Sequence, residues 1–320
     1  MKGWIIETLG QTPRLADLPR PVPGPGEVLV RVRAAGLNFA DLLMAEGKYQ
    51  DRPSLPFTPG MELAGEVEAA GPDTKAPPTG TRVAACVRCG AFAEWAVVPA
   101  DRLLPLPDAM PFDHAAGFQI AYGTSHLALA VKAALQPGET LFVTGAAGGV
   151  GLTAVEIGHL MGARVIAQVR GADKAAIARA AGAEVVFDTD PPDLKTALRD
   201  LGGMDVVYDT VGGPGFEAAL RATRPGGRML AIGFASGEVP QVPLNQLLVR
   251  NVSVIGLWWG GYLAFAPDQL TGSLATLVDW YAKGRLRPHV SASLPLTRLP
   301  EGLEAIRSRK ATGKIVLTMG

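Results

Sequence analysis

A short apolar strand, a glycine-rich turn and an amphipathic helix follow one another in the middle of this 320-residue chain. Residues 141–144 read LFVT, residues 145–151 read GAAGGVG, and apolar side chains then recur at helical spacing as far as Met161. A second apolar strand follows at 164–169. Such a βαβ unit of about 30 residues places a pyrophosphate at the N-terminus of its helix. Backbone N–H groups for this purpose are expected from Ala147, Gly148, Gly149 and Val150.

Two glycines of this turn have separate tasks. Gly148 lets the backbone approach the phosphates, and Gly151 lets the helix pack tightly on the strand. The motif therefore predicts dinucleotide binding. The alternative is an ordinary strand–helix turn that uses glycine for tightness alone.

The length and the charge of the chain indicate a two-domain protein and argue against a nucleic-acid-binding or membrane protein. A chain of 320 residues is long enough for two domains. Its 30 basic and 30 acidic residues balance, and no basic block stands out, which argues against a nucleic-acid surface or an anionic membrane patch. The chain holds no uncharged apolar run of about 18 residues, and its start reads as a strand rather than a signal peptide. We expect a cytoplasmic protein with no membrane or nucleic-acid partner.

The two cysteines, Cys86 and Cys89, are spaced as CVRC. They read most simply as small apolar residues at the end of a strand. A redox pair is the alternative, although the thioredoxin-like βαβ context of such pairs is missing here. A zinc site has less support, because no second pair and no nearby histidine complete four ligands. Unpaired cysteines suit a reducing compartment.

Secondary-structure patterns change near Phe112. Residues 1–110 give short strands with frequent turn signals, in a barrel-like rhythm. Residues 113–133 are helical, and from 139 onward strands and helices alternate, which predicts a doubly wound parallel sheet. Expected strands lie at 141–144, 164–169, 184–187, 205–209, 228–233 and 252–256, and expected helices at 151–161, 173–181, 192–201 and 214–223.

The tail after about 258 contains a helix at 272–283 and ends in a strand. That strand has no partner in the α/β region, so we expect it to return to the first domain. The predicted fold is therefore α/β with two domains. Residues 1–120 and 259–320 form the β-rich one, and residues 121–258 form the dinucleotide-binding one.

Five ordered segments carry a resemblance over almost the full length: AAGLNFADLLMAEGKY (34–49), LPFTPGMELAGEVEAAG (55–71), AAGGVG (146–151), DVVYDTVGG (205–213) and ATGKIVL (311–317). Together they resemble the medium-chain dehydrogenase/reductase superfamily, and within it the zinc-independent quinone oxidoreductases. The resemblance implies a GroES-like β-barrel catalytic domain beside a Rossmann domain.

The zinc-dependent branch of that superfamily differs from this chain at its metal ligands. It holds zinc with a cysteine in the segment that reads GLNFAD here and with the histidine of a GHE triplet. This chain has Asn38 near the first position and Met61 at the second. An amide and a thioether do not make a Zn²⁺ site, so we expect a metal-free protein. Its histidines stand apart and read as surface or helix-face residues: His114, His126, His159 and His289.

The end of the strand at 164–169 bears on the choice of nicotinamide cofactor. Proteins that bind NAD carry an acidic residue about 20 positions after the glycine turn. Here Val169 occupies that place, Arg170 follows, and Lys174 begins the next helix. A guanidinium and an ammonium suit the ribose 2′-phosphate of NADPH, and the resemblance favours NADPH as well. The alternative is that both are solvated surface charges. Related chains often carry a tyrosine where Thr189 stands here.

The resemblance also supplies candidates for the chemistry. Hydride transfer is done by the cofactor, while the protein orients the substrate and stabilises charge that develops on its oxygen. By resemblance, the Asn38 amide donates to that oxygen, Asp41 orients water or a neighbouring side chain, and Tyr49 passes a proton. Each has a structural alternative: Asn38 as the N-cap of the following helix, Asp41 as a capping residue, and Tyr49 as packing.

Further contacts are expected around the cofactor. Thr124 is placed near it by resemblance, and residues after a strand end line the ligand crevice of open α/β sheets. Lys314 either closes over the cofactor or is a solubilising charge on an edge strand. Trp259 and Tyr262 are expected to line the substrate pocket, whereas Val252–Gly256 is expected to pair with a second copy in a homodimer. The residues expected after the strand end are Gly233, Phe234, Ala235 and Ser236.

The combined expectation is a metal-independent reductase that transfers hydride from NADPH to quinones. A reductase of 2-alkenals, enones or enoyl thioesters is the alternative within the same class. A protein that binds NADPH with little turnover, or that senses redox state, is the alternative from another class.

Overall fold

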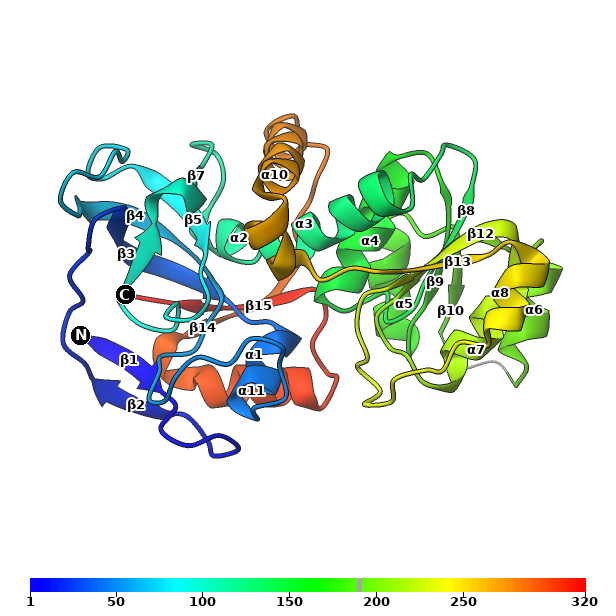
Figure 1. Cartoon of the computed structure of the whole chain (residues 1–320), viewed down its shortest axis with the longest axis horizontal. Coiled ribbons are helices and arrows are strands. Elements are labelled where there is room, and N and C mark those ends of the chain that lie inside the picture. The colour runs from blue at the N-terminus through cyan, green and yellow to red at the C-terminus, as the bar shows by residue number, and fades with distance from the viewer. Residues whose placement is uncertain (189–191) are drawn as a thin grey trace. The chain divides into compact units, whose positions relative to one another are not determined.

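The computed structural model describes residues 1–188 and 192–320, so Thr189 lies outside the described residues. It divides into two compact units. Unit 1 comprises Met1–Ile120 and Arg287–Gly320, and unit 2 comprises Ala121–Leu286. Figure 1 shows their elements coloured along the chain. No helix among the described residues is long and apolar enough to cross a membrane.

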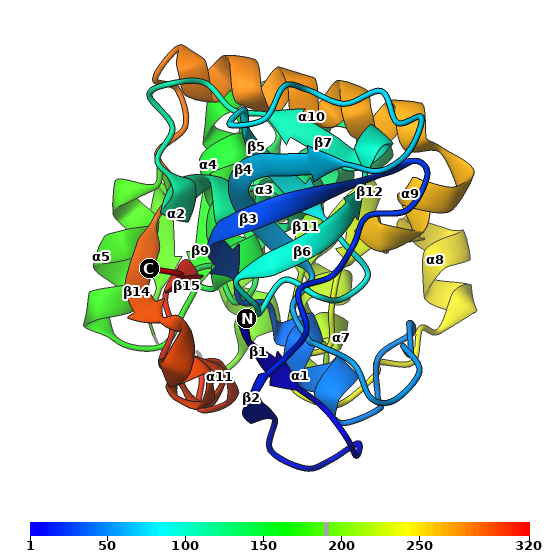
Figure 2. The same ribbon diagram turned by 90° about the vertical axis from the view of Figure 1, so that its left-hand side faces the viewer.

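Unit 1 is built on a seven-stranded mixed sheet ordered β14-β15-β3-β4-β5-β7, with β6 paired to β3. Alternate residues of β3 face the core, where Val28, Val30 and Val32 are buried. Figure 2 shows β3 and β4 running side by side. The strands of this sheet are β3 (Glu27–Gly36), β4 (Glu62–Ala70), β5 (Arg82–Cys86), β6 (Trp95–Pro99), β7 (Leu103–Pro105), β14 (Val290–Pro295) and β15 (Lys314–Thr318).

Shorter elements complete unit 1. A separate two-stranded sheet pairs β1 (Lys2–Ile5) with β2 (Arg14–Asp17). The helices are α1 (Phe39–Ala45), α2 (Phe112–Ala116) and α11 (Leu299–Arg307), with 3-10 turns at η1 (Ala100–Arg102) and η4 (Leu296–Arg298).

The last strand, β15, runs antiparallel to β3, with Thr318 opposite Ala34 and Val316 opposite Gly36. This confirms that the tail returns to the β-rich domain. β15 also pairs with β14 on its other side, so it lies inside the sheet rather than at an edge.

Unit 2 contains a six-stranded parallel sheet ordered β10-β9-β8-β11-β12-β13. The chain moves outward from β8 through β9 to β10 and then returns to place β11 beside β8. This is the predicted doubly wound arrangement, and its switch point lies between β8 and β11. The strands are β8 (Thr140–Val143), β9 (Arg164–Gln168), β10 (Val185–Phe187), β11 (Met204–Asp209), β12 (Thr223–Ala231) and β13 (Ser253–Gly256).

Alternation along β8 explains why helices cover both faces of the sheet. Leu141 packs against α4, since a Cβ on Gly158 would lie 2.4 Å from its side chain. Phe142 points the other way, into a buried cluster with residues of α6 and α7. Helix α3 (Gln119–His126) begins at the end of the first part of unit 1 and continues into unit 2. The other helices of unit 2 are η2 (Leu127–Lys132), α4 (Gly149–Leu160), α5 (Ala172–Ala180), α6 (Leu194–Asp200), α7 (Pro214–Ala222), α8 (Leu244–Arg250), η3 (Trp259–Gly261), α9 (Tyr262–Phe265) and α10 (Pro267–Ala282).

Residues 259–286 belong to unit 2, whereas the sequence patterns placed them in the β-rich domain. The reason is the packing of α10 on α3. His126 Nδ1 lies 2.8 Å from Ser273 Oγ, and its ring stands edge-on to Trp280 at 5.3 Å. Leu274 and Leu277 of the same helix are buried. A helical pattern shows which face is apolar but not which domain covers it.

Candidate active site and cofactor site

The glycine turn of unit 2 has the close packing that its sequence predicts. Gly148 is the N-cap of α4, and its N–H donates to Gly145 O at 2.9 Å. A Cβ on Gly151 would lie 2.3 Å from Gly145 O, so only glycine fits there. Ala147 is buried, while Gly148, Gly149 and Val150 are half-buried. These residues start the 12-residue helix α4, whose first N–H groups have no partner within the helix.

Hydrogen bonds from side-chain hydroxyl groups connect α3 to the first turn of α4. Ser125 Oγ donates to Val150 O at 2.9 Å and lies 2.8 Å from Thr153 Oγ1 and 3.0 Å from Tyr208 OH. Thr153 Oγ1 in turn is 3.0 Å from Ala121 O. The predicted contact residue Thr124 is buried next to Ser125. Ser125 was not among the predicted site residues, although it stands in the same AYGTSH segment as Thr124.

Asp209 organises the switch point at the end of β11. Its carboxylate accepts hydrogen bonds from Thr144 Oγ1, from Val211 N at 3.2 Å and from Gly212 N at 2.9 Å. Burial raises the pKa of this carboxyl, and those hydrogen bonds act in the opposite direction. Thr144 Oγ1 also accepts from Thr210 N at 3.0 Å. Asp209, which stands within DVVYDTVGG, was not among the predicted site residues.

The loop after β12 is held by the same segment. Ala235 N donates to Thr210 O at 3.1 Å, and Ser236 N donates to Val211 O at 2.9 Å. Gly233 is half-buried, and Phe234 is 40% exposed. The structure thus places the loops after β8, β11 and β12 in one hydrogen-bonded group at the carboxyl ends of neighbouring strands. Open α/β sheets bind ligands at such a place.

Two positive side chains lie together after β9. Arg170 is exposed, Gly171 adopts a φ of 93° as the N-cap of α5, and Lys174 is half-buried in the first turn. Burial lowers the pKa of Lys174, and the nearby charge of Arg170 lowers it further. Their contact with a cofactor phosphate stays a prediction.

A buried polar cluster forms the centre of unit 1. The Lys314 ammonium donates to Leu37 O at 2.7 Å, to Asn38 Oδ1 at 2.7 Å and to Glu62 Oε1 at 2.8 Å. Asn38 Nδ2 donates to the same Glu62 oxygen at 2.9 Å, and Ile120 N donates to Glu62 Oε2 at 3.2 Å. Asn38 is 8% exposed, Glu62 1% and Lys314 7%. Glu62 was not among the predicted site residues and was noted only as part of the triplet Gly60-Met61-Glu62.

Burial corrects one interpretation of Lys314. The residue is not a solubilising charge on an edge strand, because its side chain is buried and β15 has neighbours on both sides. All three N–H groups of the ammonium are used inside unit 1. Its contact with the cofactor therefore stays a prediction without support from this geometry.

Asp41 caps α1 from inside. Its Oδ2 accepts the N–H of Asn38 at 2.8 Å, while its buried Oδ1 has no partner among the described residues. Burial raises the pKa of the carboxyl to about 7, against the hydrogen bond from Asn38 and the charge of Lys314, and the charge of Glu62 raises it further. The alternative that Asp41 is a capping residue of α1 thus has direct support.

Replacing Asp41 with asparagine is expected to change the pH dependence of stability. The folded protein holds the Asp41 proton more tightly than the unfolded chain does, because its pKa rises from 3.8 to about 7. The stabilisation from this proton is complete below about pH 4 and is lost as the pH rises through 7. Between pH 5 and pH 8, the free energy of unfolding measured with urea should fall more for the wild type than for Asp41→Asn. The exposed Asp101→Asn is the control, and parallel curves for wild type and Asp41→Asn would contradict the prediction.

Among the described residues, the structure shows no hydrogen bond from the remaining predicted pocket residues to the polar clusters described above. Tyr49 is half-buried and packs against an apolar group that includes Met44 and Phe57. Trp259 is buried against α3, where a Cβ on Gly123 would lie 2.5 Å from its Nε1. Tyr262 is buried too, with Lys132 Nζ 5.9 Å from its ring centre. Their contact with a substrate stays a prediction.

Cys86 and His126 are both buried within secondary structure. Cys86 is buried at the end of β5, and burial raises the pKa of its thiol. His126 is buried on α3 rather than at the surface, and burial lowers its pKa. Within the described residues, no three side chains of His, Cys, Asp or Glu are grouped so as to hold a metal ion.

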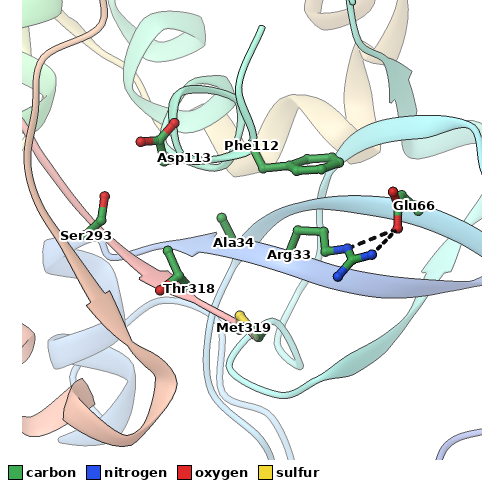
Figure 3. Close-up of a pocket in the computed structure, with 8 residues that line it drawn as sticks. All are labelled: Arg33, Ala34, Glu66, Phe112, Asp113, Ser293, Thr318 and Met319. Atoms are coloured by element: carbon green, nitrogen blue, oxygen red, sulfur yellow. Dashed lines mark hydrogen bonds and ion pairs between the residues drawn. The ribbon is translucent and has the colours of Figure 1, made fainter.

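An open hollow in unit 1 is lined by none of the predicted site residues. Figure 3 shows it beside the ion pair between Arg33 and Glu66, whose atoms Nη2 and Oε2 are 2.8 Å apart. Its lining residues are Arg33, Ala34, Glu66, Phe112, Asp113, Ser293, Thr318 and Met319. None of the polar clusters described above contributes to it.

Known domain families match both units. Residues 24–108 match the alcohol dehydrogenase GroES-like domain, and residues 149–279 match the family described as zinc-binding dehydrogenase. A GroES-like domain with a Rossmann domain defines the class: the protein is a medium-chain dehydrogenase/reductase, an oxidoreductase.

Similar proteins narrow the class. The quinone oxidoreductase-like protein 2 homolog of Nematostella vectensis is 39% identical over 300 residues, which cover 92% of this chain and 82% of that protein. The quinone oxidoreductase of Thermus thermophilus, solved also with NADPH, is 36% identical with a TM-score of 0.88, and 100% of both chains is covered. The Escherichia coli quinone oxidoreductase complexed with NADPH is 29% identical with a TM-score of 0.92, also over 100% of both. The chain belongs to the quinone oxidoreductase-like group of the medium-chain superfamily.

Proposed function

We propose that the protein is a metal-independent reductase that transfers hydride from NADPH to quinones. The observation that carries this proposal is the pair Arg170 and Lys174 beyond the glycine turn, where proteins specific for NAD place an acidic residue. The NADPH complexes of similar quinone oxidoreductases support the same cofactor and suggest the substrate class.

The residues of unit 2 fit a dinucleotide phosphate. The turn before α4 is tightly packed backbone, since a Cβ on Gly148 would lie only 3.3 Å from Gly145 O. The N–H groups of residues 147–150 would hold the pyrophosphate, and Arg170 with Lys174 would hold the ribose 2′-phosphate. Bound NADPH supplies the hydride. Thr124, Gly233, Phe234 and Ser236 remain the proposed further contacts.

On the substrate side, the proposed donor is the carboxamide of Asn38. A quinone oxygen gains negative charge as hydride arrives, and a fixed N–H donor stabilises that charge. Metal independence is supported by the chemistry of Asn38 and Met61, which replace a thiolate and an imidazole with an amide and a thioether. The buried Lys314 ammonium adds a positive charge 2.7 Å from the Asn38 carbonyl oxygen, which polarises the amide.

Oxidation of NADPH in the presence of substrate panels tests the proposal. Ortho- and para-quinones and 2-alkenals would be compared, with NADH and chelator-treated protein in parallel. Turnover that prefers NADPH and quinones and survives chelation is expected. Turnover on alkenals alone would assign the protein to the enone reductases. Tight NADPH binding without turnover would leave a cofactor-binding protein and overturn the proposed activity.

We also propose a homodimer formed through the free edge of β13. This strand ends the sheet of unit 2 in the described part of the chain, and its Val254 and Ile255 are half-buried. The preceding helix α8 exposes Leu248 and Val249, at 77% and 71%. An open edge beside exposed apolar side chains favours pairing with a second copy.

Replacing Ile255 with lysine is expected to convert a dimer into a monomer in sedimentation equilibrium, since an edge lysine blocks strand pairing. The matched control is Val186→Lys on β10, the strand at the opposite edge of the same sheet, which should leave the mass unchanged. A monomeric wild type, or a dimer that persists in Ile255→Lys, would contradict this interface.

A further inference from the structure

The Asn38 carboxamide lies between one group that only donates hydrogen bonds and one that only accepts them. Lys314 Nζ donates to its Oδ1 at 2.7 Å, and its Nδ2 donates to Glu62 Oε1 at 2.9 Å. An ammonium has no lone pair, and an ionised carboxylate has no hydrogen to give. Turning the amide by half a rotation would set donor against donor and acceptor against acceptor. The two charged neighbours therefore allow a single orientation of the amide.

In this orientation one N–H of the Asn38 amide is not used by Glu62 or Lys314. The amide nitrogen carries two hydrogens, and Glu62 accepts one of them. Among the described residues, no acceptor meets hydrogen-bond geometry with the second, although the Asn38 side chain lies close enough to the Asp41 carboxyl to lower its pKa. Asn38 is 8% exposed, Lys314 7% and Glu62 1%. The three N–H groups of Lys314 are already used within the cluster, so the second N–H of Asn38 is the donor that is left for a ligand.

Glu62 and Lys314 are themselves held in place by backbone. Glu62 Oε2 accepts from Ile120 N at 3.2 Å, and Lys314 donates to Leu37 O at 2.7 Å. A Cβ on Gly36 would lie 2.7 Å from Glu62 Oε1, and one on Gly117 would lie 3.1 Å from the Lys314 side chain. With this packing and with their hydrogen bonds already made, the two charged groups cannot turn toward a substrate. Any effect they have on chemistry passes through Asn38.

We propose that Glu62 and Lys314 are positioning residues that fix the Asn38 amide, so that its second N–H is aimed at the substrate oxygen when negative charge develops there. This inference rests on the proposed function. It assigns a positioning role to Glu62, for which the resemblance implied no role. It assigns the same role to Lys314, which was predicted to close over the cofactor. Preorganised donors of this kind need no reorientation at the moment of reaction.

A double-mutant cycle on kcat tests the proposal. Asn38→Ala removes the donor and is expected to lower kcat about 100-fold. Glu62→Gln keeps the shape but can pair with either end of the amide, so kcat is expected to fall about tenfold. In the Asn38→Ala background, Glu62→Gln should have no further effect on kcat. The KM and Kd for NADPH should stay unchanged, because the proposed cofactor contacts lie in unit 2.

A second variant covers the case in which Glu62→Gln leaves Lys314 without a counter-charge and fails to fold. Glu62→Gln/Lys314→Met removes both buried charges and should repeat the same cycle with Asn38→Ala. The exposed Lys310→Gln, placed just before β15, is the control that keeps wild-type kcat. Circular dichroism and thermal unfolding identify the variants that fold.

The outcomes separate the two proposals. An unchanged kcat in Asn38→Ala would remove Asn38 from the proposed chemistry. A reduced kcat in Asn38→Ala, with Glu62→Gln or the neutral pair lowering kcat by the same factor in both backgrounds, would overturn the positioning part alone. A folded Glu62→Gln or neutral pair with wild-type kcat would overturn it as well.

Discussion

Replacing Gly151 with alanine is expected to weaken NADPH binding by more than about tenfold, equal to about 1.4 kcal/mol, and to lower the free energy of unfolding by about 2 kcal/mol. The new Cβ would lie 2.3 Å from Gly145 O and 2.8 Å from Gly145 C, and both are backbone atoms that cannot rotate away. The first turn of α4 must then move off the strand, which displaces the N–H groups proposed to hold the pyrophosphate. Fluorescence titration with NADPH and urea unfolding measure the two effects.

Gly272→Ala is the matched control for this prediction. Gly272 lies within α10, and nothing stands within 4 Å of the Cβ it would gain. Alanine is favoured over glycine in a helix by about 1 kcal/mol, so this variant should be slightly stabilised and bind NADPH normally. If Gly151→Ala bound NADPH as tightly as the control does, the turn would not be the pyrophosphate site.

Replacing Arg170 and Lys174 together with alanine is expected to raise the KM for NADPH about 100-fold and to leave the KM for NADH nearly unchanged. Each charge-assisted hydrogen bond to the 2′-phosphate contributes about 1.5 kcal/mol, and the two together give that factor. NADH has no 2′-phosphate and so loses nothing. Initial rates with both cofactors give the ratio directly.

Arg179→Ala serves as the control, because Arg179 is an exposed arginine in the last turn of the same helix. It removes one charge from α5 without touching the start of the helix, and the cofactor preference should persist. A double variant that keeps the wild-type ratio of NADPH to NADH would show that Arg170 and Lys174 are solvated surface charges, the alternative considered from the sequence.

Much of the fold could be predicted because its signals are local. The alternation of strands and helices in unit 2 follows from periodicity that is visible within windows of ten to twenty residues. The glycine turn is equally local, since Gly145 and Gly151 are close in the chain and their contact is fixed by one turn of backbone. Most predicted and observed strands of unit 2 accordingly differ by at most one residue at either end, as in 164–169 against Arg164–Gln168, whereas β12 begins five residues before the predicted 228–233.

The central cluster of unit 1 could be predicted only in part, because its contacts span the chain. Lys314 bonds Leu37 and Glu62 across sequence separations of 277 and 252 residues. Resemblance drew attention to Asn38 and Asp41, but a glutamate that begins an apolar strand carries no local sign of its partner. Asp209 was missed for a related reason, since its partners include Thr144 in another strand's loop. A buried charge is recognised by its partner, and the partner is known only after folding.

Unit 2 is inserted between two parts of unit 1, and this has a consequence for synthesis on the ribosome. The strand that carries Lys314 emerges after all of unit 2, so residues 1–120 must wait for it with Glu62 lacking its ammonium partner and β3 lacking β15. Unit 2 is continuous in sequence and can fold as soon as it has emerged. The nascent protein is thus expected to gain its nucleotide-binding part first and the buried cluster of Asn38, Glu62 and Lys314 last. An unfinished chain is then expected to take up cofactor before that cluster is complete.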